Sequence, residues 1–233
     1  MPQSMKHLVG VKLDGLDDKI GHTKDFYFDD QEWVVRYVVM DTGSWLPGRK
    51  VLISRHAFSN LELTDGNLVV NLTRKHIEHS PSIESHKPVS RRFEEEYHKY
   101  YGWPGYWLGD SVCGIAGYPM IPPPITFHPF EPATTETSQH ESYDNHLRSM
   151  QDVIGHHIKA SDGMCGHVYD FMIDPETWKI PQLVIKTGHL FLNKEVDIPS
   201  DKIEYISWDQ DTVFVDLTRD AIEQRPEHHL EVL

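Results

Sequence analysis

The chain of 233 residues contains the same segment twice. A shift of 145 positions aligns residues 4–81 with residues 149–226 without a gap, and VNLTRKHIEHSP and VDLTRDAIEQRP close the two copies. Two copies are too few for a solenoid, in which each repeat buries its apolar face only against its neighbours. We therefore predict two small domains, at 4–81 and 149–226, each with a core of its own and joined by a linker at 82–148.

Each copy has the pattern of β structure. Its short runs are rich in Val, aromatic and other apolar residues, which is typical of strands. The turns DDQE and DPET, which begin at Asp29 and Asp174, predict a hairpin. Thr73 and Thr218 are expected to cap a short helical turn. Five or six strands in so short a segment predict a small closed barrel, because closure removes exposed edges.

The copies resemble the PRC-barrel family, which is named after the cytoplasmic domain of the photosynthetic reaction-centre H subunit. The resemblance rests on the hairpin IGHTKDFYFDD, the strand VVRYVVMDTG and the closing VNLTRKHIEHSP, and it extends over both copies. It implies a mainly β chain with two tandem PRC-type barrels, each followed by a short helical turn. Since this family serves largely in assembly and protein contact, the resemblance also implies a non-catalytic role.

The linker combines a helix with a dense aromatic segment. VSRRFEEEYHKYYG has an apolar stripe at helical spacing, and Gly102 stands where a C-terminal cap is expected. The prolines of MIPPPITFHPFEP then indicate an extended tether. The aromatic residues are interface candidates: Tyr100, Tyr101, Trp103, Tyr106 and Trp107. They either seal a contact between the domains or between subunits, or form an exposed platform for a partner.

A second set of interface candidates lies at the bend between two predicted strands. GSWLPGRK and GHLFLNKE place large apolar side chains there: Trp45, Leu46, Leu190, Phe191 and Leu192. Apolar surface at a hairpin tip is unfavourable in water. We therefore expect these tips to form the pseudo-twofold interface or an intersubunit interface.

Two His/Asp pairs recur and are ligand-cleft candidates. They are His22 with Asp25, and His167 with Asp170. A carboxylate can orient an imidazole, but side chains three residues apart on a strand point to opposite faces, which favours a structural role. The 16 histidines follow no zinc-ligand spacing, and no catalytic motif is present. We predict no metal, no cofactor and no enzymatic activity.

Charge and composition restrict the class of partner. A net charge of −14 argues against nucleic acid and anionic membranes. The first copy holds 10 basic and 11 acidic residues (net −1) and the second 7 and 14 (net −7), which favours a basic protein partner for the second. Two cysteines, no secretory signal and no spanning segment predict a cytoplasmic protein.

These observations predict a non-catalytic interaction or scaffold protein that forms homo-oligomers. The alternative is a protein that binds a small molecule or a metal in the cleft between the barrels, with His22 and His167 among the lining residues.

Overall fold

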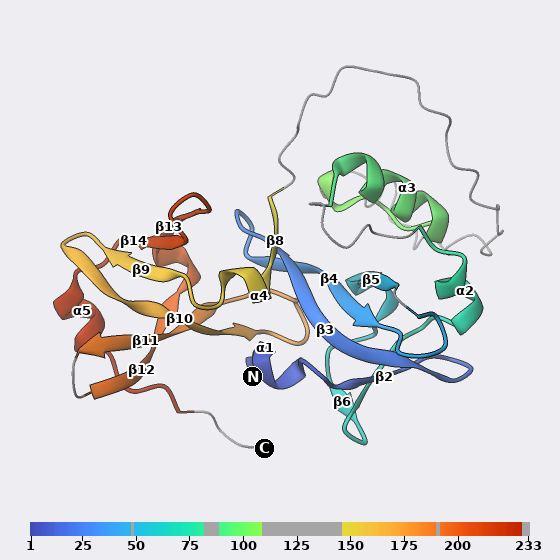
Figure 1. Cartoon of the computed structure of the whole chain (residues 1–233), viewed down its shortest axis with the longest axis horizontal. Coiled ribbons are helices and arrows are strands. Elements are labelled where there is room, and N and C mark those ends of the chain that lie inside the picture. Colours follow the sequence, from blue (N-terminus) through green and yellow to red (C-terminus); the bar gives the residue numbers. More distant parts are fainter. Residues whose placement is uncertain (48, 82–88, 109–145, 190–191, 230–233) are drawn as a thin grey trace, which may run out of the picture.

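The computed structural model describes residues 1–47, 49–81, 89–108, 146–189 and 192–229, and it is mainly β. Two mixed sheets lie side by side, one built largely from each repeat (Figure 1). The short helices α1 (Met5–Leu8) and α4 (Met150–Val153) lie between them. Helix α3 (Arg91–Tyr101) covers one side of the first-repeat sheet.

The first-repeat sheet has the order β5-β4-β3-β2-β7-β6, and β8 pairs with β3. Its strands are β2 (Lys12–Asp14), β3 (Lys19–Asp29), β4 (Val34–Asp41), β5 (Lys50–Ser54), β6 (Leu63–Thr64), β7 (Asn67–Val69) and β8 (Leu147–Ser149). The 3-10 helix η1 (Arg55–Ala57) follows β5, and helix α2 (Arg74–Glu78) follows β7. A further 3-10 turn, η2 (Tyr106–Leu108), follows α3.

The second-repeat sheet repeats this order as β12-β11-β10-β9-β14-β13, and β1 pairs with β10. Its strands are β1 (Gln3–Ser4), β9 (His157–Ala160), β10 (Gly163–Ile173), β11 (Gln182–His189), β12 (Leu192–Pro199), β13 (Ile203–Ser207) and β14 (Thr212–Val215). The 3-10 helix η4 (Ser200–Lys202) and helix α5 (Arg219–Glu223) occupy the positions of η1 and α2. The duplicated sequence therefore produces a duplicated topology.

The two sheets are not closed barrels, which corrects the predicted architecture. Among the described residues, β5 pairs only with β4 and β6 only with β7, so both ends of the first sheet stay open. Closure requires a matched tilt and stagger around the whole sheet. Strands β6 and β7 have two and three residues, too short to present a full partner to β5.

Each repeat lends its first strand to the other repeat. Strand β1 pairs with β10, and β8 pairs with β3. The two hairpin ends also meet, because Val35 N–H donates to Trp178 O and Ile180 N–H donates to Trp33 O. These reciprocal contacts, which we call the seam, relate the repeats by a pseudo-twofold axis.

The interior of the seam is apolar and continuous. Phe26 and its counterpart Phe171 are both fully buried, and the rings of Phe28 and Phe171 lie 5.2 Å apart. Trp33 and Trp178 both adopt positive φ angles, 52° and 63°. The buried residues of both repeats form one core, whereas the sequence predicts two separate cores. The domain boundaries themselves stay a prediction.

Local predictions hold where the structure describes them. The hydroxyls of Thr73 and Thr218 accept from backbone N–H groups in the first turns of α2 and α5. The Asp29 and Asp174 carboxylates accept from amides of their own turns. Gly102 ends α3 with φ 69°, as expected for a C-terminal cap. No helix in the described part of the chain has the length and apolarity to cross a membrane.

Candidate functional site

The predicted cleft aspartates lie in the seam, where they accept hydrogen bonds from the opposite repeat. Ser149 Oγ donates to Asp25 Oδ2 (2.6 Å), and Gln151 N–H donates to Asp25 Oδ1 (3.1 Å). The second repeat mirrors this, since Asp170 accepts from Ser4 Oγ and from the Lys6 amide. Each aspartate thus holds the first turn of the other repeat's short helix.

Burial governs the protonation of these two carboxyls. It raises the pKa of Asp25 and of Asp170, while the hydroxyl bonds from Ser149 and Ser4 act in the opposite direction. A carboxyl whose oxygens are held by neighbouring donors has little freedom to bind a ligand or exchange protons with a substrate. Their geometry therefore supports a structural role.

The two histidines do not join these aspartates. His22 and His167 lie on outer faces of the two sheets, at equivalent positions in β3 and β10. His22 Nε2 lies 4.0 Å from Asp41 Oδ2, and Lys186 stands opposite His167. The structure therefore does not bring the four predicted ligand-cleft residues together.

The tip residues lie apart from the seam where they are described. Trp45 packs within the first repeat, with its indole N–H donating to Ile20 O (2.8 Å) and the Arg74 guanidinium 5.3 Å from its ring. Leu46 is half-buried, and its carbonyl accepts from the Thr42 hydroxyl. Strand β12 begins at Leu192, while Leu190 and Phe191 lie outside the described residues.

The linker aromatics gather on α3 and the first-repeat sheet. Tyr101 is buried and stacks on Trp103 at 4.4 Å, and Tyr100 donates from its hydroxyl to His76 O. Tyr106 lies 4.0 Å from the Arg36 guanidinium, and Trp107 lies against Arg91. The contacts named here attach the helix to the first repeat and do not join the two repeats. A contact of these residues with another subunit or a partner stays a prediction.

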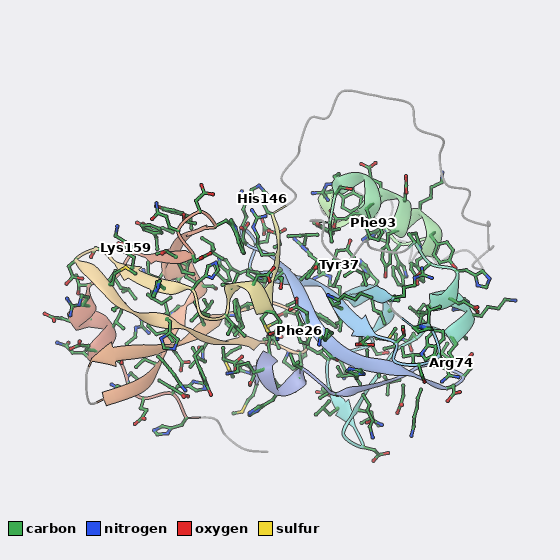
Figure 2. The ribbon with its side chains drawn as sticks, in the orientation of Figure 1. Phe26, Tyr37, Arg74, Phe93, His146 and Lys159 are labelled. Atoms are coloured by element: carbon green, nitrogen blue, oxygen red, sulfur yellow. The ribbon has the colours of Figure 1, made fainter. Side chains whose placement is uncertain are left out.

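Beneath this layer is a buried polar cluster around Glu94, which is fully buried. Tyr37 Oη and Tyr106 Oη donate to Glu94 Oε1 at 2.9 Å and 2.7 Å. Arg91 lies 3.1 Å from the other carboxylate oxygen. His98 Nε2 also lies 2.9 Å from the Tyr37 hydroxyl, which has a single proton for two acceptors. Figure 2 shows Tyr37 on the side of its sheet that faces α3.

Desolvation sets the protonation of this cluster. Burial lowers the pKa of His98 to about 4 and raises the pKa of Tyr37 and of Tyr106. Pro104 O can only accept, so the His98 nitrogen Nδ1 at 2.9 Å carries the proton. His98 and both tyrosines are therefore neutral near pH 7, and the cluster stabilises the α3 contact.

The outer face of the second-repeat sheet carries an exposed apolar row. The row crosses β10, β9, β14 and β13, with one residue from each strand opposite the next. In that order its members are Met164, Lys159, Phe214 and Tyr205, and we call the row the outer stripe. Met164 is 49% and Tyr205 53% exposed. Tyr205 stacks on Phe214 at 4.4 Å, and the Lys159 ammonium lies 5.1 Å from the Phe214 ring. Lys159 lies far from α3 (Figure 2).

The equivalent row in the first repeat is mostly polar, with Val69 as its one apolar member. Lys19, Asp14, Val69 and Asn60 stand at the positions of Met164, Lys159, Phe214 and Tyr205. The outer stripe is therefore a property of the second repeat alone. Sequence reasoning missed it, although a comparison of the two copies at these four positions would have found it.

A groove of about 430 Å³ lies at the seam beside Trp33, and we call it the Trp33 groove. Trp33, Pro181 and Ile203 form its apolar part, and Glu32, Lys179 and Asp201 are the charged residues along it. Residues of both repeats line it, and none of the predicted cleft residues is among them. No sequence pattern marks a hollow that forms only where two distant hairpins meet.

The described residues show little redox or metal chemistry. They hold no group of three or more His, Cys, Asp or Glu side chains arranged to bind a metal ion. Burial raises the pKa of the Cys165 thiol to about 11, which keeps it protonated and unreactive near neutral pH. Cys113 lies outside the described residues.

Comparison of the sequence with protein-family models and with curated proteins finds no match in either case.

Proposed function

We propose that the chain is a non-catalytic interaction or scaffold protein of PRC-barrel type that self-associates in the cytoplasm. The repeat, the hairpin motif and the mainly β sheets support the family resemblance, although the sheets are open. The observation that carries the proposal is the outer stripe, because exposed aromatic and Met side chains in a continuous row mark contact surfaces.

The outer stripe is self-complementary. A twofold axis between Lys159 and Phe214 would place Met164 of one molecule on Tyr205 of the other, and Lys159 on Phe214. Sulfur–aromatic and cation–π contacts are both favourable. In such an isologous interface each contact occurs twice, so a row of four residues supplies two copies of both contacts.

The acidic residues of the seam support the non-catalytic part. Asp25 and Asp170 occupy equivalent positions in the two copies, and both are engaged in bonds between the repeats. The acidic surface of the second repeat further favours a basic partner beside the second molecule.

Light scattering across a concentration series tests the self-association. The wild type is expected to show a mass above that of one chain, rising with concentration. The double variant Met164→Lys/Tyr205→Asn carries the first repeat's residues at these exposed positions and is expected to remain monomeric. Leu63→Ser, which removes an exposed apolar side chain from the first-repeat sheet, is the matched control and should associate like the wild type.

A wild type that stays monomeric at the highest soluble concentration would remove the proposal. So would a double variant that associates as strongly as the wild type, provided that its thermal unfolding shows it to be folded.

A second candidate function is the binding of a small molecule in the cleft between the repeats. The Trp33 groove favours it, because ligand sites are concave and combine apolar walls with a few polar groups. Native mass spectrometry of the purified chain would detect a retained ligand, and a mass equal to that of the bare chain would count against it.

A further inference from the structure

The Trp33 groove has a counterpart on the other side of the seam, and there the place is filled. At that place, the ring of Phe58 lies 5.2 Å from the ring of Trp178, and Trp178 is 5% exposed. The residue equivalent to Phe58 is Ile203, which lines the groove beside the half-buried Trp33. One pseudo-symmetric position is therefore covered by an aromatic ring, and the other is open.

A difference between two hairpins explains the asymmetry. Asp65 and Gly66 both have positive φ angles, which suits a tight two-residue turn and leaves β6 only two residues long. In the second repeat the loop is longer, and β13 pairs with β14 from Ile203 onward. The residues before β6 are thus free to fold over Trp178, while their equivalents are held in a strand.

Beside Trp178, a segment of the chain itself occupies the position equivalent to the Trp33 groove. The backbone at Phe58 is extended, and Leu61 N–H donates to Pro175 O at 3.1 Å. An aromatic side chain on the tryptophan and a backbone hydrogen bond nearby together fix this segment. Both features are available to any extended peptide.

A second aromatic contact marks the same surface of the first repeat. Tyr106 covers Arg36 at 4.0 Å, and Trp103 lies 6.0 Å from His56. Arg36 and His56 are the equivalents of Pro181 and Asp201 in the Trp33 groove. The chain therefore covers this surface with its own aromatic residues in one repeat.

We propose that the Trp33 groove binds an aromatic side chain on an extended, basic peptide segment of a partner protein. Glu32 and Asp201 are exposed at the groove and outnumber Lys179, so basic residues flanking the aromatic ring complement it. The inference rests on the proposed interaction function, but it uses a surface separate from the outer stripe.

The probe is the peptide acetyl-Arg-Gly-Phe-Gly-Arg-amide, titrated into the labelled full-length chain. The NMR signal of the Trp33 indole N–H, assigned with Trp33→Phe, reports binding. We expect this signal to shift and saturate. The same peptide with Ala in place of Phe should bind at least about tenfold more weakly, because the buried ring is lost. The Trp178 signal should stay unchanged.

Two variants alter the groove itself. Ile203→Phe gives the groove the residue that covers Trp178, and it should abolish the shift while the chain remains folded. Asp201→Lys changes an exposed charge at the groove, and it should weaken the basic peptide and favour a peptide with Glu in place of both Arg residues.

Three results would overturn the inference: no shift of the Trp33 signal, an equal shift with the Ala peptide, or unaltered binding in both variants. Phenol that binds as tightly as the peptide would instead assign the groove to a small molecule. Light scattering of the same samples keeps the two proposals apart, since loss of self-association leaves the peptide result standing.

Discussion

The two repeats share their seam but differ at the outermost strand of each sheet. In the first repeat, Tyr97 of α3 covers the edge strand β5. Its hydroxyl donates to Leu52 O (2.9 Å) and accepts from Ser54 N–H (3.1 Å). A single buried side chain therefore satisfies two backbone groups that an edge strand otherwise leaves open.

The second repeat protects the equivalent strand β12 by other means. Pro199 stands at the position of Ser54 and has no N–H to satisfy. Arg225 donates to Asp197 O at 3.1 Å, and His228 N–H donates to Glu195 O at 2.7 Å. A short C-terminal segment thus takes the place that α3 takes in the first repeat.

The two edges separate contacts made by residues of the repeat from contacts made by chain outside it. The aspartate contacts across the seam come from residues present in both copies, Asp25 and Asp170, so these contacts are symmetric. Among the segments that cover the two edge strands, α3 and residues 227–229 lie outside the aligned segments. A duplicated module keeps the contacts that its own residues make. Its open edges are covered by the chain that adjoins it.

The largest effect is expected at the first edge. Tyr97→Ala should lower the free energy of unfolding by about 3–5 kcal/mol, because it removes a fully buried ring and exposes the β5 edge. Tyr97→Phe isolates the hydroxyl and should cost about 1–3 kcal/mol. Urea denaturation measures both.

The control for the first edge is His228→Ala at the second edge. It removes a side chain whose Nδ1 lies 2.7 Å from the Asp197 carboxylate but keeps the backbone bonds, and should cost about 1 kcal/mol. If His228→Ala destabilises the chain more than Tyr97→Ala, the contrast between the two edges is wrong.

Replacement of either seam aspartate should lower the free energy of unfolding by the same amount. Asp25→Ala and Asp170→Ala each remove the acceptor of one serine hydroxyl and two backbone amides, one of them from the opposite repeat, and each should cost about 1–3 kcal/mol. A double-mutant cycle of Asp25 with Ser149 should show coupling, while the cycle of Asp25 with Ser4 should be close to additive. Unequal costs for the two aspartates would contradict the pseudo-twofold seam.

Local features of this fold could be predicted from the sequence. The Thr73 cap, the Asp29 turn and the Gly102 helix end each depend on a few neighbouring residues, and all three are found in the structure. The duplicated strands followed from the repeat for the same reason.

Long-range pairing could not be predicted in this way. The identity of Ser4-Met5 and Ser149-Met150 was visible, but nothing in it shows that each pair crosses to the other repeat. The sequence pattern therefore predicts a cleft for Asp25 and Asp170, whereas the structure places them in the seam. The expected barrels failed for a related reason, since closure depends on strand lengths that the pattern does not fix.

A pH effect is expected at α3, which has no equivalent in the second repeat. Because the folded-state pKa of His98 is lowered to about 4, the unfolded chain binds the proton more tightly between pH 6.5 and 4. The contribution of His98 to the free energy of unfolding is therefore complete above pH 6.5 and falls as the pH falls. At pH 5 the loss from this residue is about 2 kcal/mol.

His98→Gln keeps a neutral polar side chain and removes this titration. The wild type should lose more stability than the variant between pH 7 and pH 5, as measured by urea denaturation at both values. Equal losses would mean that His98 titrates normally and that the cluster is not closed to solvent.

The smallest effect is expected on the outer faces, where the repeats have exchanged the order of their charges. Lys186 and Glu195 form a 3.1 Å ion pair across β11 and β12, and Asp41 and Lys50 stand at the equivalent positions with the signs reversed. Both side chains of the Lys186 pair are more than a quarter exposed, so water and salt screen their attraction.

A Lys186→Asp/Glu195→Lys variant gives the second repeat the charge order of the first. Its stability should change by less than about 0.5 kcal/mol, and the coupling energy of the wild-type pair from a double-mutant cycle should be equally small. A large loss would show that the outer face is as constrained as the seam. A negligible loss, beside a cost of about 1–3 kcal/mol for either seam aspartate, would explain why two copies with the same interior carry such different surface charge.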